Sequence, residues 1–340
     1  MPLTICLAED RVNEETGFRI AILSLVEHVP EATILLYRPK PTASLIDWLK
    51  RFPQVQLITE WPGKAGWNCK PQALLDVLAR GHESVVWLDT DVLIGRSFHD
   101  VVETGDDRTL VIALEPAHSY PQGTETRTVG WGMTVGRRFP ITLNSCVLRV
   151  TQAHRPLLNR WNELLVDEKY LLAQKQPSHL RPIYFMGDQE PLNALLGSTE
   201  FADIPVKQLQ RGSDVAHTGA ARSYTIVERL AGLFHSIPPF LHTQWSKPWI
   251  ILAETKAGGS HEHFRRLVLE TSLYVALAKK YRAALGSDTD TAWMDYSTVP
   301  GRIVRALGFG HFALRGLPLT AFATAREALV DLKNPGRKDH

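Results

Sequence analysis

The segment from residue 85 to residue 93, Val-Val-Trp-Leu-Asp-Thr-Asp-Val-Leu, constrains the fold of this chain more than any other. Its β-branched and aromatic residues predict a strand buried on both faces, as in a sheet covered by helices. Asp89 and Asp91 follow that run, and in an open α/β sheet the carboxyl ends of the strands border the ligand crevice. Residues i and i+2 of a strand point the same way, so both carboxylates could bind one cation. An Asp-rich turn at a strand end would give the same pattern, and the segment alone leaves both interpretations open.

The rest of the chain alternates between strand-like and helix-like patterns. Short apolar runs predict strands at residues 3–8, 33–37, 55–58, 110–114 and 146–150. Apolar residues at helical spacing predict helices at residues 18–29, 45–52, 71–80, 157–172, 188–197 and 262–285. Residues 118–138 lack periodicity and predict a loop. This alternation indicates an α/β fold with a parallel sheet flanked by helices.

Composition excludes several classes of protein. The 340 residues suffice for one large domain or two smaller ones, and the net charge of +2 argues against a nucleic-acid-binding protein. Cys6, Cys69 and Cys146 are widely spaced and odd in number, which indicates free thiols in a reducing compartment. No apolar stretch approaches the ~20 residues that cross a bilayer, and Glu9 and Asp10 follow the first strand too early for a signal peptide. We therefore expect a cytoplasmic protein, with any membrane contact peripheral and at the inner face.

Further motifs lie downstream of the Asp-Thr-Asp segment. They are Leu-Asn-Ser-Cys-Val at residues 143–147, Phe-Met-Gly-Asp-Gln-Glu-Pro-Leu-Asn at 185–193, and His-Thr-Gln-Trp-Ser-Lys-Pro-Trp at 242–249. Together, and in this order, the motifs resemble those of the retaining glycosyltransferases of family 8, which are nucleotide-sugar enzymes. The resemblance implies a GT-A fold, with a mixed, mostly parallel sheet flanked by helices. It also implies a catalytic domain over residues 1–250, which leaves residues 251–340 as a helical C-terminal extension.

A metal and phosphate site can be argued from the chemistry of these residues. His242 could complete a metal site with Asp89 and Asp91, because imidazole suits Mn²⁺ as well as carboxylates do. Either Mn²⁺ or Mg²⁺ is expected. Lys247 would place a point charge against a diphosphate, and Pro248 would hold it in an extended conformation. The interval from His242 to Lys247 is one residue shorter than is usual in the family, so His235 and His217 are alternative ligands.

The resemblance also implies contacts with a UDP-sugar donor. Ala8 and Asp10 correspond to the stretch that holds the base and ribose, and Lys70 lies near the basic residue that approaches the sugar phosphate. Asn144 and Ser145 match residues that contact the donor sugar, and Cys146 replaces the usual glycine there. Asp89 belongs to the donor site as well as to the metal site. For Asn144 the alternative interpretation is an ordinary turn residue.

Asp188 and Gln189 match the pair that lies beside the anomeric carbon in the family. In a front-face transfer, Asp188 binds sugar hydroxyls and the carbonyl oxygen of Gln189 stabilises positive charge. A double displacement would instead need one of them as a nucleophile. The alternative role for Asp188 is a helix N-cap.

We therefore expect a metal-dependent enzyme that moves a hexose from a UDP-sugar to a glycan or glycolipid, with retention of anomeric configuration. A haloacid dehalogenase-like phosphohydrolase is one alternative, because the nucleophile motif of that superfamily also has two aspartates one residue apart after a strand. A nucleotide-sugar-binding protein without catalytic activity is another.

The C-terminal segment is basic and apolar. No acidic residue falls between Asp295 and Glu327. Arginines alternate there with apolar side chains, among them Arg302, Arg305, Arg315, Ile303, Val304, Leu307, Phe309, Phe312, Leu314 and Leu317. Such a segment is typical either of a peripheral contact with an anionic membrane or of a tail packed on the catalytic domain.

Overall fold

The computed structural model describes residues 3–63, 66–116, 122–254, 258–308 and 310–333, which form two compact units. The first unit comprises the described residues up to Val92, Ser97–Glu115 and those from 122 to Gln210. The second comprises Leu93–Arg96, Pro116 and the described residues from Arg211 onward. The division at residue 250 that the motifs imply remains a prediction.

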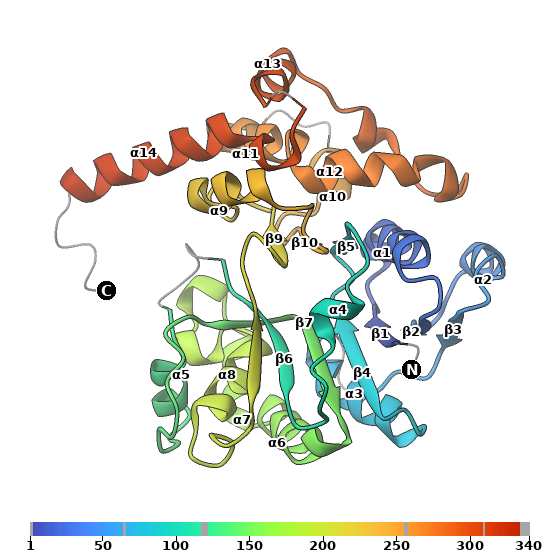
Figure 1. Cartoon of the computed structure of the whole chain (residues 1–340), viewed down its shortest axis with the longest axis vertical. Coiled ribbons are helices and arrows are strands. Elements are labelled where there is room, and N and C mark those ends of the chain that lie inside the picture. The colour runs from blue at the N-terminus through green and yellow to red at the C-terminus, as the bar shows by residue number, and fades with distance from the viewer. Residues whose placement is uncertain (1–2, 64–65, 117–121, 255–257, 309, 334–340) are drawn as a thin grey trace. The chain divides into compact units, whose positions relative to one another are not determined.

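A seven-stranded sheet forms the centre of the first unit, in the order β3-β2-β1-β4-β7-β6-β8 (Figure 1). Its strands are β1 (Thr4–Ala8), β2 (Thr33–Tyr37), β3 (Val55–Ile58), β4 (Ser84–Leu88), β6 (Leu110–Leu114), β7 (Leu143–Thr151) and β8 (Val206–Leu209). All neighbouring strands are parallel except that β7 runs antiparallel to β4 and to β6. The expected mixed, mostly parallel sheet is confirmed.

Helices of the first unit cover this sheet. They are α1 (Glu15–His28), α2 (Ala43–Leu49), α3 (Lys70–Ala79), α4 (His99–Val102), α5 (Glu125–Gly130), α6 (Arg155–Leu165), α7 (Glu168–Gln174) and α8 (Gln189–Gly197). Short 3-10 helices are η1 (Val12–Glu14), η2 (Gly66–Cys69), η3 (Gln152–His154), η4 (Ser178–Leu180) and η5 (Ile183–Phe185). Apolar faces of α3, α6 and α8 join one sheet face in a core that includes Trp87, Leu148 and Trp161. Trp131 also packs against this core, stacked on Tyr170 at 6.2 Å.

The Asp-Thr-Asp segment is a turn between two strands, so the expected placement of Asp89 and Asp91 on the strand itself is wrong. β4 ends at Leu88, and the Val92 N–H donates to the Asp89 carbonyl oxygen at 3.0 Å. β5 (Val92–Ile94) then enters a different sheet. Asp89 and Asp91 are therefore placed by this turn rather than by the alternation of side chains along a strand.

Several helices differ from the predicted ones because a single polar side chain starts a new helix. The helix expected over 157–172 is divided into α6 and α7, since Asp167 Oδ1 accepts from the Lys169 N–H at 2.8 Å. Residues 262–285 are likewise divided, because Ser272 Oγ accepts from the Val275 N–H at 3.2 Å. The loop expected over 118–138 contains α5, although its first residues lie outside the described ones.

The second unit contains the three-stranded sheet β5-β10-β9 and a set of helices. Its other strands are β9 (Val215–His217) and β10 (Phe240–His242), which are parallel. Its helices are α9 (Ile226–Ala231), α10 (Pro248–Ile251), α11 (Ser260–Glu270), α12 (Leu273–Ala278), α13 (Val299–Leu307) and α14 (Leu317–Lys333), with 3-10 helices η6 (Gly232–Phe234), η7 (Lys279–Ala284), η8 (Ala292–Asp295) and η9 (Phe312–Leu314). The expected helical C-terminal part is confirmed. Among the described helices, none combines the length and apolar character needed to cross a membrane.

Candidate active site

Pairing of the strands gathers polar residues at one edge of the seven-stranded sheet. Asp89 follows β4, and its N–H donates to the Cys146 carbonyl oxygen of β7 at 2.9 Å. Glu115 follows β6, and its N–H donates to the Thr142 carbonyl oxygen just before β7, also at 2.9 Å. Because β7 is antiparallel to both strands, its first residues lie beside the last residues of β4 and β6. Asn144 is therefore a buried strand residue, and the turn interpretation is wrong.

Lys70 is the centre of a buried ionic network at this edge. Its side chain is 4% exposed at the start of α3. Its Nζ lies 2.9 Å from Asp89 Oδ1 and 3.0 Å from Asp188 Oδ2, and it donates to Ser145 Oγ at 2.8 Å. Burial alone would lower the pKa of Lys70, but Asp188 and Asp89 raise it above its usual value, so the ammonium stays charged. Trp87 Nε1 also donates to Asp89 Oδ1, at 2.7 Å.

Asp188 is not a helix cap. It precedes α8, but its side chain accepts no capping hydrogen bond and instead contacts Lys70 and Ser145. The indole Nε1 of Trp161 donates to its backbone carbonyl oxygen at 2.8 Å and fixes the start of the helix. Burial raises the pKa of Asp188, Lys70 opposes that shift, and nearby Asp89 adds to it. The ammonium of Lys70 therefore favours the ionised form of this carboxylate.

Gln189 is held by two carboxylates that the motifs did not indicate. Its Nε2 donates to Glu115 Oε2 at 3.1 Å and lies 3.5 Å from Glu190 Oε1. Asn144 Nδ2 donates to the same Glu115 oxygen, and Glu190 forms a buried ion pair with Arg127. Because carboxylates only accept hydrogen bonds, this arrangement fixes the amide nitrogen and thereby orients the carbonyl oxygen Oε1 away from Glu115.

The residues that follow β1 form a second cluster in the first unit. Thr90 of the Asp-Thr-Asp turn donates to Glu9 Oε2 at 2.7 Å, and Arg11 Nε donates to Glu9 Oε1 at 2.8 Å. Asp10 Oδ2 accepts from the Gly66 N–H at 2.8 Å. Ala8, the last residue of β1, pairs with Tyr37. Glu9 thus connects the predicted base-binding stretch to the turn that carries Asp91.

The remaining predicted residues belong to the second unit. His242 ends β10, and its Nδ1 lies 3.2 Å from Nδ1 of His217, the neighbouring residue on β9. His235 is exposed at the end of η6. Lys247 directly precedes α10 with φ −84° and ψ 110°, the extended backbone that Pro248 was expected to impose.

The sequence motifs missed Glu115, Glu190, Arg127 and Glu9. A usable signal existed for Glu115, because it is the acidic residue directly after the apolar strand β6, just as Asp89 follows β4. The roles of Glu190 and Arg127 depend on a buried pair between α5 and α8 that no local pattern indicates.

Comparison with known proteins identifies the fold through a solved structure. No protein-family model and no curated protein sequence matches the chain. The structure of the galactosyltransferase LgtC in complex with donor and acceptor sugar analogs matches with a TM-score of 0.50 and 15% identity, over 86% of this chain and 99% of that one. The chain has the GT-A fold. The resemblance argued from the motifs is therefore confirmed at the level of the fold.

Further matches are weaker. The glycosyltransferase GlyE of Streptococcus pneumoniae TIGR4 matches with a TM-score of 0.47 and 14% identity, over 85% of this chain and 66% of that one. The bifunctional glycosyltransferase WbbM matches with a TM-score of 0.46 and 12% identity, over 73% and 46% of the two chains.

Proposed function

We propose that this chain is a metal-dependent glycosyltransferase that moves a hexose from a UDP-sugar to a glycan or glycolipid acceptor with retention of anomeric configuration. One observation carries the proposal: residues predicted from separate motifs form a single buried network within a GT-A fold. Lys70, Asp89, Ser145 and Asp188 are joined directly, and Gln189 follows Asp188 at the start of α8.

The proposed metal ligands are Asp89, Asp91 and His242, with Mn²⁺ or Mg²⁺ as the ion. Two carboxylates and an imidazole suit a divalent ion of this type. Connectivity supports the set, because β5 begins directly after Asp91 and shares its sheet with β10, which ends at His242. When bound, the ion would supply positive charge that neutralises the leaving diphosphate. Lys247 is proposed to add a second charge to the same group.

Asp188 and Gln189 are proposed to act on the donor sugar in a front-face transfer. Asp188 Oδ2 is already engaged by Lys70 and Ser145, which favours a role in binding sugar hydroxyls over direct attack on the anomeric carbon. Gln189 would direct Oε1 at the anomeric carbon and stabilise its positive charge. Glu115 is proposed as a positioning residue, because it holds the amide nitrogen of Gln189.

The central experiment measures UDP release from UDP-glucose, UDP-galactose and related donors with Mn²⁺ present. We expect release that EDTA abolishes, and Asp91→Asn should lose metal-dependent donor binding while the exposed variant Asp47→Asn keeps it. Absence of both turnover and donor binding across a broad panel would reject the proposal. Release of inorganic phosphate from phosphate esters would support the phosphohydrolase alternative instead.

A second experiment separates catalysis from binding. Glu115→Gln should lower kcat about tenfold or more, because it frees the Gln189 amide to rotate, while the donor Kd changes by less than about threefold. Donor binding by calorimetry with no transfer, unchanged in Gln189→Ala, would support a binding protein without catalytic activity.

A further inference from the structure

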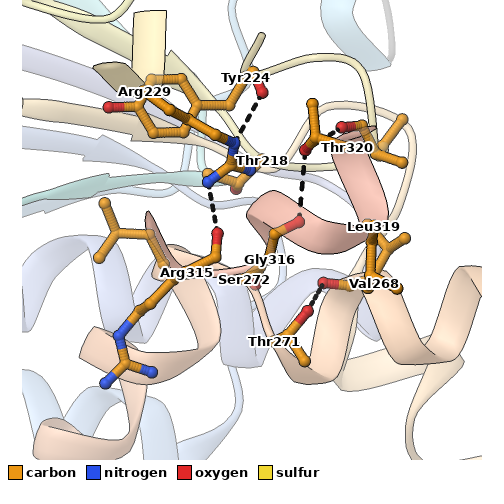
Figure 2. Close-up of a pocket in the computed structure, with 13 residues that line it drawn as sticks. Thr218, Tyr224, Arg229, Val268, Thr271, Ser272, Arg315, Gly316, Leu319 and Thr320 are labelled. Atoms are coloured by element: carbon orange, nitrogen blue, oxygen red, sulfur yellow. Dashed lines mark hydrogen bonds between the residues drawn. The ribbon is translucent and has the colours of Figure 1, made fainter. Parts of the chain in front are cut away.

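The second unit contains a small pocket (Figure 2). It lies where α11 meets α12 and where η9 leads into α14. Thr218, Arg229, Thr271, Ser272, Gly316 and Thr320 are among the residues that line it. Its volume is about 20 Å³, while ~10–15 Å³ on this measure holds one water molecule. The occupant must therefore be a single small group.

Arg229 brings a positive charge to this pocket without a negative partner. The residue is 7% exposed, and its Nε donates to the Tyr224 carbonyl oxygen at 2.9 Å. Its Nη1 donates to the carbonyl oxygens of Ala313, at 3.2 Å, and of Arg315. Within the part of the chain that the structure describes, Nη2 makes no hydrogen bond and no carboxylate pairs with this guanidinium. Neutral carbonyl oxygens satisfy its donors but leave its charge uncompensated.

The charge of Glu228 acts on Arg229 and raises its pKa, but among the described residues this carboxylate does not pair with the guanidinium. Glu228 on the same helix accepts from the Thr225 N–H at 2.8 Å and lies 3.4 Å from Arg211. Arg315, from the segment before α14, adds a further positive charge. Burial lowers the pKa of Arg229 to about 10, so it remains protonated at neutral pH.

A second donor without an acceptor lines the same pocket. Ser272 is 7% exposed, and its Oγ accepts from the Val275 N–H at 3.2 Å. Among the described residues, none accepts a hydrogen bond from the Ser272 hydroxyl. The hydroxyls of Thr218 and Thr320, in contrast, donate to the carbonyl oxygens of His242 and Ala221. Among the described groups that line the pocket, Arg229 Nη2 and the Ser272 hydroxyl are therefore donors without an acceptor.

The start of α14 adds a positive electrostatic potential, which favours an anion. Gly316, with φ +72°, lines the pocket and directly precedes this helix of 17 residues. The positive end of the helix dipole therefore faces the same region. A helix start alone binds nothing specific, but here it coincides with the buried guanidinium and the serine hydroxyl.

We infer that this pocket binds one small monatomic anion of the size of chloride, held by Arg229 Nη2 and the Ser272 hydroxyl. The volume excludes a nucleotide or a sugar, and the donors require an acceptor with negative charge. The site is independent of the proposed transfer reaction. It adjoins the strand of the proposed metal ligand, because the Thr218 N–H donates to the His242 carbonyl oxygen at 2.8 Å.

Thermal unfolding of the full chain in sodium chloride and in sodium gluconate of equal ionic strength tests this inference. Chloride should raise Tm by about 2–4 °C with saturation, because an anion that binds only the folded state stabilises it. Arg229→Met should abolish the chloride-specific rise, and the exposed variant Arg326→Met should retain it. Equal Tm values in both salts for the unmodified chain, or an unchanged rise in Arg229→Met, would overturn the inference.

Two further measurements cover the case in which Arg229→Met does not fold. Ser272→Ala keeps the guanidinium and should shift the chloride midpoint to a concentration at least about threefold higher. Bromide soaked into crystals of the unmodified chain should give an anomalous peak in the pocket beside Arg229. An unchanged midpoint together with no peak in the pocket would reject the site.

Discussion

Lys70 places its ammonium between two carboxylates, the buried Asp188 and the partly exposed Asp89, whose side chain is 25% exposed. Lys70→Met removes the cation and leaves the buried Asp188 carboxylate without this partner. We expect the free energy of unfolding, measured by urea denaturation at pH 7, to fall by about 3–5 kcal/mol. Lys50→Met is the matched control, because it breaks an exposed ion pair with Asp47, at 2.6 Å, and should cost about 1 kcal/mol or less. Similar losses in both variants would contradict the central role of Lys70.

Glu190 should make stability depend on pH. Burial raises the pKa of Glu190 to about 7, and Arg127 opposes that shift. Because this lies above the unfolded value of ~4.3, the stability that Glu190 contributes is fully present below pH ~4.3 and is lost as pH rises to about 7. We therefore compare the free energy of unfolding of the unmodified chain with that of Glu190→Gln. The first minus the second should fall by on the order of 1–3 kcal/mol as the pH rises across this range.

Urea denaturation of both proteins at several pH values measures this difference in the free energy of unfolding. Glu163→Gln, on the exposed side of α6, is the matched control. Its difference from the unmodified chain in the free energy of unfolding should change less with pH. A difference that rises with pH for Glu190→Gln would show that the Arg127 ion pair outweighs burial.

Residue roles were predictable where the residue belongs to a motif and were missed where they depend on a distant partner. Asp188, Gln189 and Ser145 follow from motifs, and the structure joins Asp188 and Ser145 through Lys70. The alternative N-cap role for Asp188 failed because the competing partner, Lys70, is far away in sequence. Arg127 gave no signal, since its partner Glu190 approaches only when α5 packs on α8.

At the scale of elements, strands were predicted better than helix ends. β2, β3 and β6 have the predicted bounds, because turn residues bracket a short apolar run. Helix breaks at Asp167 and Ser272 each depend on one hydrogen bond within a continuous apolar pattern, so periodicity alone merges the helices.

Helix α13 presents an apolar face to solvent. Val299, Ile303 and Leu307 are 59%, 57% and 54% exposed and lie four residues apart, with exposed Arg302 beside them. We propose that this face contacts an anionic membrane, which would bring the proposed glycosyltransferase to a lipid-linked acceptor. The double variant Ile303→Glu/Leu307→Glu should weaken binding to vesicles that contain anionic lipid by about tenfold or more.

Vesicle sedimentation measures this binding, with neutral vesicles as the reference for the charge contribution. Val227→Glu on α9 is the matched control, because Val227 is even more exposed, at 76%, and lies on a different helix of the same unit. Equal binding by the double variant and the unmodified chain would contradict a membrane contact through α13. It would instead support the alternative interpretation, a tail packed on the catalytic domain.

At the scale of the whole molecule, the two units are not consecutive segments. The chain leaves the first unit at Leu93, supplies β5 to the sheet of the second, and returns at Ser97. The Gly95 N–H donates to the Pro239 carbonyl oxygen at 2.8 Å, which ties this excursion to residues far along the chain. Sequence patterns could not indicate such an exchange, because residues 92–94 look like the continuation of β4.

The predicted domain boundary at residue 250 can be tested with a fragment of residues 1–250. Trp249 is buried and packs against Tyr274 at 6.2 Å and Trp293 at 6.5 Å, measured between ring centroids. Removal of residues 251–340 would take away both aromatic partners of Trp249 and also α12, which contacts β10. We therefore expect the fragment to aggregate or to lose cooperative thermal unfolding, while the full chain carrying Trp249→Ala loses about 3–5 kcal/mol but still folds. A soluble, cooperatively folded fragment that binds donor would instead support a catalytic domain that ends at residue 250.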